Sequence, residues 1–84
     1  MDVDGVEQLL DEMIGQQVAK VFALARRLVP HVTQEDLLNP HDFAPLAESA
    51  EFNFEDGILA GLRAALLAVR AARRGEAVDS RGPG

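Results

Sequence analysis

Apolar residues recur at intervals of three and four along two long stretches of the chain, residues 4–29 and 54–74. In the first stretch the apolar stripe consists of Leu10, Ile14, Val18, Val21, Phe22, Ala25, Leu28 and Val29. In the second stretch the stripe consists of Ile58, Leu62, Ala65, Leu66 and Val69. This spacing is that of an amphipathic α-helix, so the pattern predicts two long helices.

Capping residues and a proline set the expected ends of these helices. Asp4 is a favourable N-cap for the first helix, and Pro30 ends it because proline disfavours helical geometry in the residue before it. Asn53 is a favourable N-cap for the second helix. We therefore expect helices at about 4–29 and 54–74.

The connection at residues 33–50 contains Pro40 and Pro45, so only short helical turns are expected there. Thr33 and Asp36 have the spacing of a capping box, which would open the first turn. The large apolar residues in and just after the connection are Leu37, Leu38, Phe43, Leu46, Phe52 and Phe54. A segment this apolar is expected to cover one end of the helices as a plug. The alternative is a groove that binds a peptide or helix.

The expected fold is all-α: residues 1–74 form one helical domain, an antiparallel helical hairpin with a short helical insert. Both predicted helices run from an acidic start to a basic end. Antiparallel packing sets each acidic end beside a basic end, which favours this orientation over the parallel one. Residues 75–84 are expected to form a disordered tail.

The hairpin has more apolar surface than it can cover. The chain has 84 residues, of which 48% are hydrophobic, and it lacks the cysteines that could form disulfides. Two helices enclose no interior, so we expect a homodimer that forms a four-helix bundle, with a further protein partner as an additional candidate. The expected interface residues are Ile14, Val18, Val21, Phe22, Ala25, Gly57, Ile58, Gly61, Leu62, Ala65, Leu66 and Val69.

Small residues form a ridge along the second predicted helix. Gly57, Gly61 and Ala65 follow one another at a spacing of four. Small residues let two helix backbones approach closely, so the ridge is interpreted as a tight helix crossing. On this interpretation, Gly61→Leu destabilises the assembly by about 1–3 kcal/mol through overpacking.

The charge of the chain restricts its partners. The net charge is −6, which repels nucleic acid and anionic membranes at long range. The longest apolar run, residues 58–72, is interrupted by Arg63 and Arg70 and is shorter than the roughly 20 residues of a membrane span. The start of the chain is acidic, unlike a signal peptide. We expect a soluble cytoplasmic protein with no nucleic-acid or membrane partner.

The sequence contains little that supports catalysis. Cysteine and tyrosine are absent, hydroxyl side chains are few, and there is no glycine-rich phosphate loop. We therefore expect a non-enzymatic interaction or structural module without a cofactor.

Two alternative functions stay open. The first is a metal-binding or small-ligand protein, for which the candidate ligands are His31, Glu35, His41 and Asp42. The second is a DNA-binding or antitoxin-like regulator, which would use an arginine face on the last helix. That face consists of Arg63, Arg70 and Arg74, at positions i, i+7 and i+11.

Overall fold

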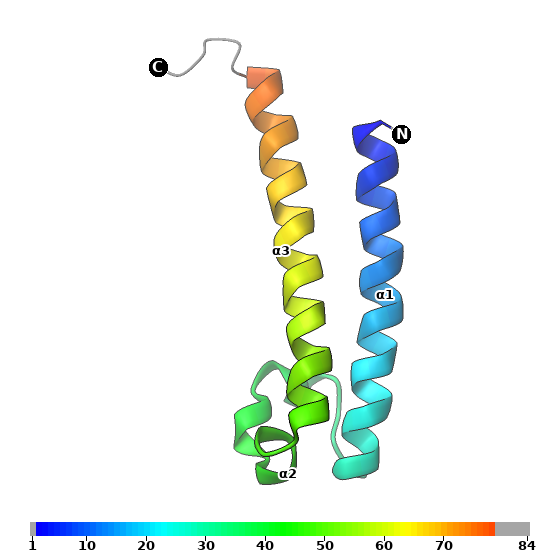
Figure 1. Ribbon diagram of the computed structural model, residues 1–84, viewed down its shortest axis with the longest axis vertical. Coiled ribbons are helices and arrows are strands. Elements are labelled where there is room, and N and C mark those ends of the chain that lie inside the picture. The colour runs from blue at the N-terminus through cyan, green and yellow to red at the C-terminus, as the bar shows by residue number, and fades with distance from the viewer. Residues whose placement is uncertain (1, 79–84) are drawn as a thin grey trace.

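The chain folds as two long helices that lie side by side and run in opposite directions (Figure 1). The computed structural model describes residues 2–78, and no strand occurs among them. Helix α1 spans Val3–Leu28 and helix α3 spans Ala50–Val78. Three short elements fold against one end of this pair: the 3₁₀ turns η1 (Glu35–Leu38) and η2 (Pro40–Asp42) and the one-turn helix α2 (Ala44–Ala47). The predicted all-α hairpin with a short helical insert is confirmed.

Helix α1 begins two residues earlier than its predicted cap implies. Asp2, and not Asp4, is the N-cap, and its Oδ1 accepts a hydrogen bond from the Gly5 amide at 2.7 Å. Asp4 instead lies in the first turn, where its charge is favourable to the helix dipole. The helix ends just before Pro30, as the sequence predicts.

Helix α3 begins at Ala50, four residues before the predicted start. The Ser49 hydroxyl oxygen accepts a hydrogen bond from the Phe52 amide at 3.0 Å, so Ser49 takes the capping role expected of Asn53. Asn53 lies inside the helix, and its side-chain amide donates to the Ala47 carbonyl at 3.0 Å. That bond ties the end of α2 to the start of α3.

The far end of α3 also extends beyond its predicted boundary. The helix continues to Val78, so residues 75–78 are helical although they were expected to belong to a tail. A lone glycine such as Gly75 costs about 1 kcal/mol of helix propensity, which weakens a helix without ending it. The rest of the expected tail, residues 79–84, lies outside the described residues.

The hydrophobic core lies at the end of the hairpin that the insert covers. Its buried residues are Val21, Leu24, Ala25, Val32, Leu46, Phe52 and Leu59. Leu46 and Phe52 are fully buried, and the partly buried Leu37 and Phe43 pack against this cluster. These four residues form the expected plug. Leu38 and Phe54, which were grouped with them, are exposed.

The capping box in the insert forms as predicted. The Thr33 amide donates to Asp36 Oδ2 at 3.0 Å, and the Asp36 amide donates to Thr33 Oγ1 at 3.2 Å. The two reciprocal bonds satisfy backbone donors that a helical turn otherwise leaves free. They fix the direction in which η1 leaves the loop that follows α1.

Ion pairs join α1 and α3 at both ends of the hairpin. At the open end they are Asp4–Arg73 at 2.6 Å, Glu7–Arg73 at 3.1 Å, Glu7–Arg70 at 3.5 Å and Asp11–Arg70 at 3.8 Å. At the covered end they are Lys20–Glu55 at 3.3 Å and Arg27–Glu51 at 4.0 Å. Each acidic helix start therefore lies beside a basic helix end, as the charge order predicts.

Candidate functional site

The four candidate metal ligands do not come together. His31 follows α1, Glu35 lies in η1, and His41 and Asp42 lie in η2, and all four side chains are exposed. Among residues 2–78, no three His, Cys, Asp or Glu side chains gather in a group that could hold a metal ion. The structure thus gives no support to a metal site at these positions.

The arginine face of the last helix is interrupted at its centre. Arg70 forms ion pairs with Glu7 and Asp11 of α1, so its charge is already compensated. A helix that reads nucleic acid presents uncompensated positive charge along one face. Arg63 and Arg74, on either side of Arg70, do not form such a continuous face.

One side of the hairpin carries exposed apolar residues from both long helices. Lys20 and Gln17 of α1 contact Glu55 of α3 on this side. Helix positions separated by three, four or seven residues share a face. The same side of the hairpin therefore also carries apolar residues that precede Lys20 on α1 and apolar residues that follow Glu55 on α3. These residues, which we call the apolar flank, are Leu9, Met13, Ile58, Leu62 and Val69.

The apolar flank is only partly covered by the chain itself. Leu9 is 45% exposed, Met13 is 41% exposed and Ile58 is 38% exposed. Leu62 and Val69 are half-buried. Exposed apolar side chains that gather on one side of a protein mark an interaction site, whereas single exposed apolar residues are ordinary.

The outer face of α3 is exposed and uncharged. Between residues 57 and 72 the charged side chains are Arg63 and Arg70 alone, and both lie on the part of α3 that is turned toward α1 and the insert. The remaining exposed positions in this range are Gly57, Ile58, Ala60, Gly61, Ala64, Ala65, Leu67, Ala68, Ala71 and Ala72. A helix face that remains in water is normally polar.

The ridge of small residues does not lie in the crossing of α1 and α3. Apart from its chain neighbours and the backbone of its own helix, a Cβ atom added at Gly57 or at Gly61 would meet no atom within 4 Å. The tight crossing expected from these residues is therefore absent from the hairpin itself. The chain places the ridge on the outer face of α3, because the large residues Leu59 and Leu66 are the ones that turn toward the core.

The twelve expected interface residues fall into three groups. Val21, Ala25 and Leu66 are buried by the chain's own fold and are not available to a second copy. The half-buried residues are Ile14, Val18, Phe22, Leu62 and Val69. The exposed residues are Gly57, Ile58, Gly61 and Ala65.

Glu55 is a buried carboxylate that the sequence interpretation did not single out. Gln17 Nε2 donates to Glu55 Oε1 at 2.8 Å and to its backbone carbonyl at 2.9 Å, and Lys20 Nζ lies 3.3 Å from Glu55 Oε2. The Gln17 hydrogen bond and the Lys20 charge hold the pKa of Glu55 below its usual value, against the effect of burial. In the sequence, Gln17 lies three residues after Ile14 and four before Val21, on the same helix face as the apolar stripe. A polar residue at that position could have indicated that a polar partner, here Glu55, lies opposite it.

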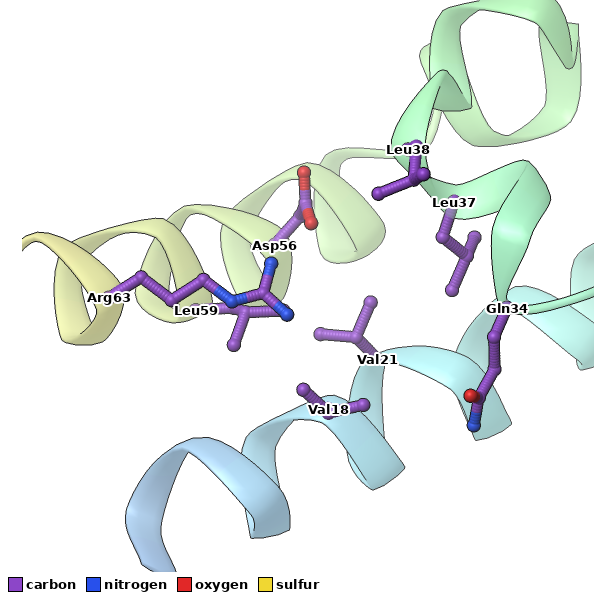
Figure 2. Close-up of a pocket in the computed structure, with 8 residues that line it drawn as sticks. All are labelled: Val18, Val21, Gln34, Leu37, Leu38, Asp56, Leu59 and Arg63. Atoms are coloured by element: carbon purple, nitrogen blue, oxygen red, sulfur yellow. The ribbon is translucent and has the colours of Figure 1, made fainter. Parts of the chain in front are cut away.

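A small pocket opens between α1, η1 and α3, on a side of α3 different from that of the apolar flank (Figure 2). It has a volume of about 170 Å³. Its lining residues are Val18, Val21, Gln34, Leu37, Leu38, Asp56, Leu59 and Arg63. The sequence did not predict this pocket, because it depends on how the insert packs against both helices.

Comparison with known proteins found no matching family model, no similar curated protein and no similar solved structure. None of the helices in residues 2–78 combines the length and the apolar character that a membrane crossing needs. The functional interpretation of these sites therefore rests on the structure of this chain alone.

Proposed function

We propose that the protein is a non-enzymatic, self-associating helical module in which two hairpins pack together as a four-helix bundle. The observation that carries this proposal is the composition of α3, where 14 of the 16 residues from 57 to 72 are uncharged and apolar. One neighbouring helix covers only one face of such a helix. A helix this apolar is normally covered on more than one face.

The apolar flank provides the contact surface for the second copy. It draws Leu9 and Met13 from α1 and Ile58, Leu62 and Val69 from α3, so it runs along both long helices. A two-fold axis would place this surface against itself, as in most homodimers. A standard interface buries about 800 Å² on each partner, which is roughly a seventh of the 5748 Å² surface of this chain.

The net charge of −6 on each copy opposes association. Exposed charges are screened within about 8 Å at physiological ionic strength, so added salt weakens the repulsion between copies. We expect the dimer to become tighter as salt rises from low to physiological concentration. This direction distinguishes apolar association from association through surface ion pairs, which salt would weaken. A chain without cysteine also fits a reducing compartment, and we include the cytoplasm in the proposal.

Charge placed on the apolar flank tests the proposal. Met13→Glu introduces a carboxylate at an exposed position of the flank, and Leu62→Asp does so closer to its centre. Leu38→Asp is the matched control, because Leu38 is 74% exposed and lies on the insert, outside the flank. Native mass is measured by light scattering, with circular dichroism to verify helix content.

We expect a dimer for the wild type and for Leu38→Asp, and a monomer for Met13→Glu. Met13→Glu keeps the test informative even if Leu62→Asp unfolds, because Met13 is already partly exposed to water. A folded Met13→Glu variant that keeps the dimeric mass would refute the assignment of this surface.

A further inference from the structure

The pocket between α1, η1 and α3 lies apart from the surface that we assign to self-association. Arg63 and Asp56 belong to a side of α3 different from that of Ile58 and Leu62, so a dimer formed through the apolar flank leaves the pocket open to solvent. We propose that this pocket binds a free α-amino acid with a large apolar side chain, of which phenylalanine and leucine are examples.

The floor of the pocket is apolar and well supported. It is formed by Val18 and Val21 from α1, Leu37 from η1 and Leu59 from α3 (Figure 2). Val21 is 1% exposed and Leu59 is 6% exposed, so both are held by the core beneath them. The volume of about 170 Å³ is close to that of an engineered protein cavity, about 150 Å³, that binds benzene. The floor therefore suits one aromatic ring or one branched aliphatic side chain.

Two opposite charges stand together at one wall of the pocket. Asp56 and Arg63 are seven residues apart on α3, so they lie on one face two turns apart. Figure 2 shows the Arg63 guanidinium between the Asp56 carboxylate and the valines of α1. Neither residue belongs to any ion pair within 4.0 Å in the described part of the chain. Both charges are therefore available to a ligand.

The pair of charges determines the class of ligand. Arginine recognises a carboxylate through two parallel hydrogen bonds, and an aspartate accepts hydrogen bonds from an ammonium group. A simple carboxylic acid would gain from Arg63 but be repelled by Asp56, and a simple amine would meet the opposite problem. An α-amino acid carries both groups on one carbon, next to the side chain that the floor accepts.

The mouth of the pocket contains two further groups that a ligand can use. Gln34 supplies an amide that can donate to a carboxylate or accept from an ammonium group. Leu38 is 74% exposed, and a ligand in the pocket would cover part of its side chain. The exposure of so large an apolar residue at the mouth is explained if its apolar surface meets a ligand.

Three probes that share a phenyl group separate the contributions. They are L-phenylalanine, 3-phenylpropionate, which lacks the ammonium group, and 2-phenylethylamine, which lacks the carboxylate. Binding to the isotope-labelled full chain is followed by shifts of the backbone amide signals of Val18, Leu37 and Leu59. We expect saturable shifts with L-phenylalanine, and a dissociation constant about tenfold higher for each of the other two, equivalent to about 1.4 kcal/mol.

Variants of the two charged residues then assign the roles. Arg63→Gln is expected to weaken L-phenylalanine and 3-phenylpropionate while leaving 2-phenylethylamine unchanged or tighter. Asp56→Asn is expected to weaken L-phenylalanine and 2-phenylethylamine while leaving 3-phenylpropionate unchanged or tighter. Arg74→Gln, an exposed arginine on the same helix that does not line the pocket, is the matched control and is expected to change none of them.

Absence of saturable shifts with L-phenylalanine at millimolar concentration would overturn the proposal. Equal affinity for all three probes would also overturn it, because the charges would then play no part in recognition. An equal loss with Arg74→Gln and Arg63→Gln would show a general charge effect and would refute the site. Native mass does not enter this experiment, so its outcome is separate from that of the self-association proposal.

Discussion

At the scale of single residues, Glu55 shows how the hairpin accommodates a carboxylate near its core. Only 9% of the residue is exposed, and the charge of its carboxylate is stabilised by contacts with Gln17 and Lys20. Burial alone would favour the neutral acid, whereas a hydrogen bond to the charged form and a nearby cation favour the carboxylate. Together the Gln17 hydrogen bond and the Lys20 charge outweigh burial, so the pKa of Glu55 is lowered.

The lowered pKa of Glu55 predicts how stability depends on pH. A carboxyl group with a lower pKa in the folded state than in the unfolded state stabilises the fold above its unfolded value, which is about 4.5. This contribution is lost as pH falls through the pKa of the folded state. Glu55→Gln should therefore lower the free energy of unfolding at pH 7, and the difference from the wild type should shrink below pH 4.5.

Urea unfolding followed by circular dichroism at neutral and acidic pH measures this difference. Glu48→Gln is the control, because Glu48 is exposed and forms no ion pair within 4.0 Å in the described residues. A difference between wild type and Glu55→Gln that stayed constant through the acid range would show that the Glu55 pKa is not lowered by folding.

Phe52 and Phe54 form a natural comparison between core and surface. Phe52 is fully buried, whereas Phe54, two residues later on α3, is 66% exposed. Phe52→Ala should cost about 3–5 kcal/mol in the free energy of unfolding, because it leaves a cavity beneath the insert. Phe54→Ala should change the stability of the hairpin by about 0.5 kcal/mol or less. Denaturant melts of both variants check this, and similar losses for the two would contradict the arrangement of the core.

At the scale of elements, the two long helices, their order and the presence of a short helical insert between them followed from the sequence. The spacing of apolar residues identified α1 and α3, and the order of charges identified their antiparallel packing. The capping box at Thr33 and Asp36 also formed as expected. These signals are local, so they do not depend on which surfaces later come together.

The ends of the helices and the position of the small residues were predicted less well. Asp2, Asp4, Ser49 and Asn53 are all capable N-caps, and the choice among them depends on how the chain enters each helix. The pocket depends on how the insert packs against helices that are distant from it in the sequence, and no short sequence pattern indicates such packing. Gly57 and Gly61 were placed in a crossing by their spacing, but spacing alone does not say which face of a helix turns toward its neighbour.

The open position of Gly61 predicts that a side chain there is tolerated by the hairpin. Gly61→Ala should stabilise the isolated chain by up to about 1 kcal/mol, because alanine favours the helix and the added Cβ meets nothing within 4 Å. Gly15→Ala is the matched variant on α1, where the added Cβ also meets nothing. Thermal melts at low concentration compare the two with the wild type. Destabilisation by Gly61→Ala under dilute conditions would mean that this face is already packed within the single chain.

At the scale of the whole molecule, the hairpin is a long and thin object with extents of 51 × 26 × 20 Å. Its radius of gyration is 16.5 Å, compared with about 12 Å for a compact domain of this length. The core is concentrated at the end of the hairpin that the insert covers. At the opposite end, ion pairs of Arg70 and Arg73 join the two helices. Such a shape leaves much of each helix without a neighbour, and packing against a second copy would supply one.

The most direct test of this account is the native mass of the full chain as a function of concentration, measured by sedimentation equilibrium at neutral pH. A folded species with twice the chain mass of 9.1 kDa is expected. Dissociation of this dimer should become harder as salt rises from low to physiological concentration. A folded monomer of 9.1 kDa that persists to high protein concentration would contradict self-association.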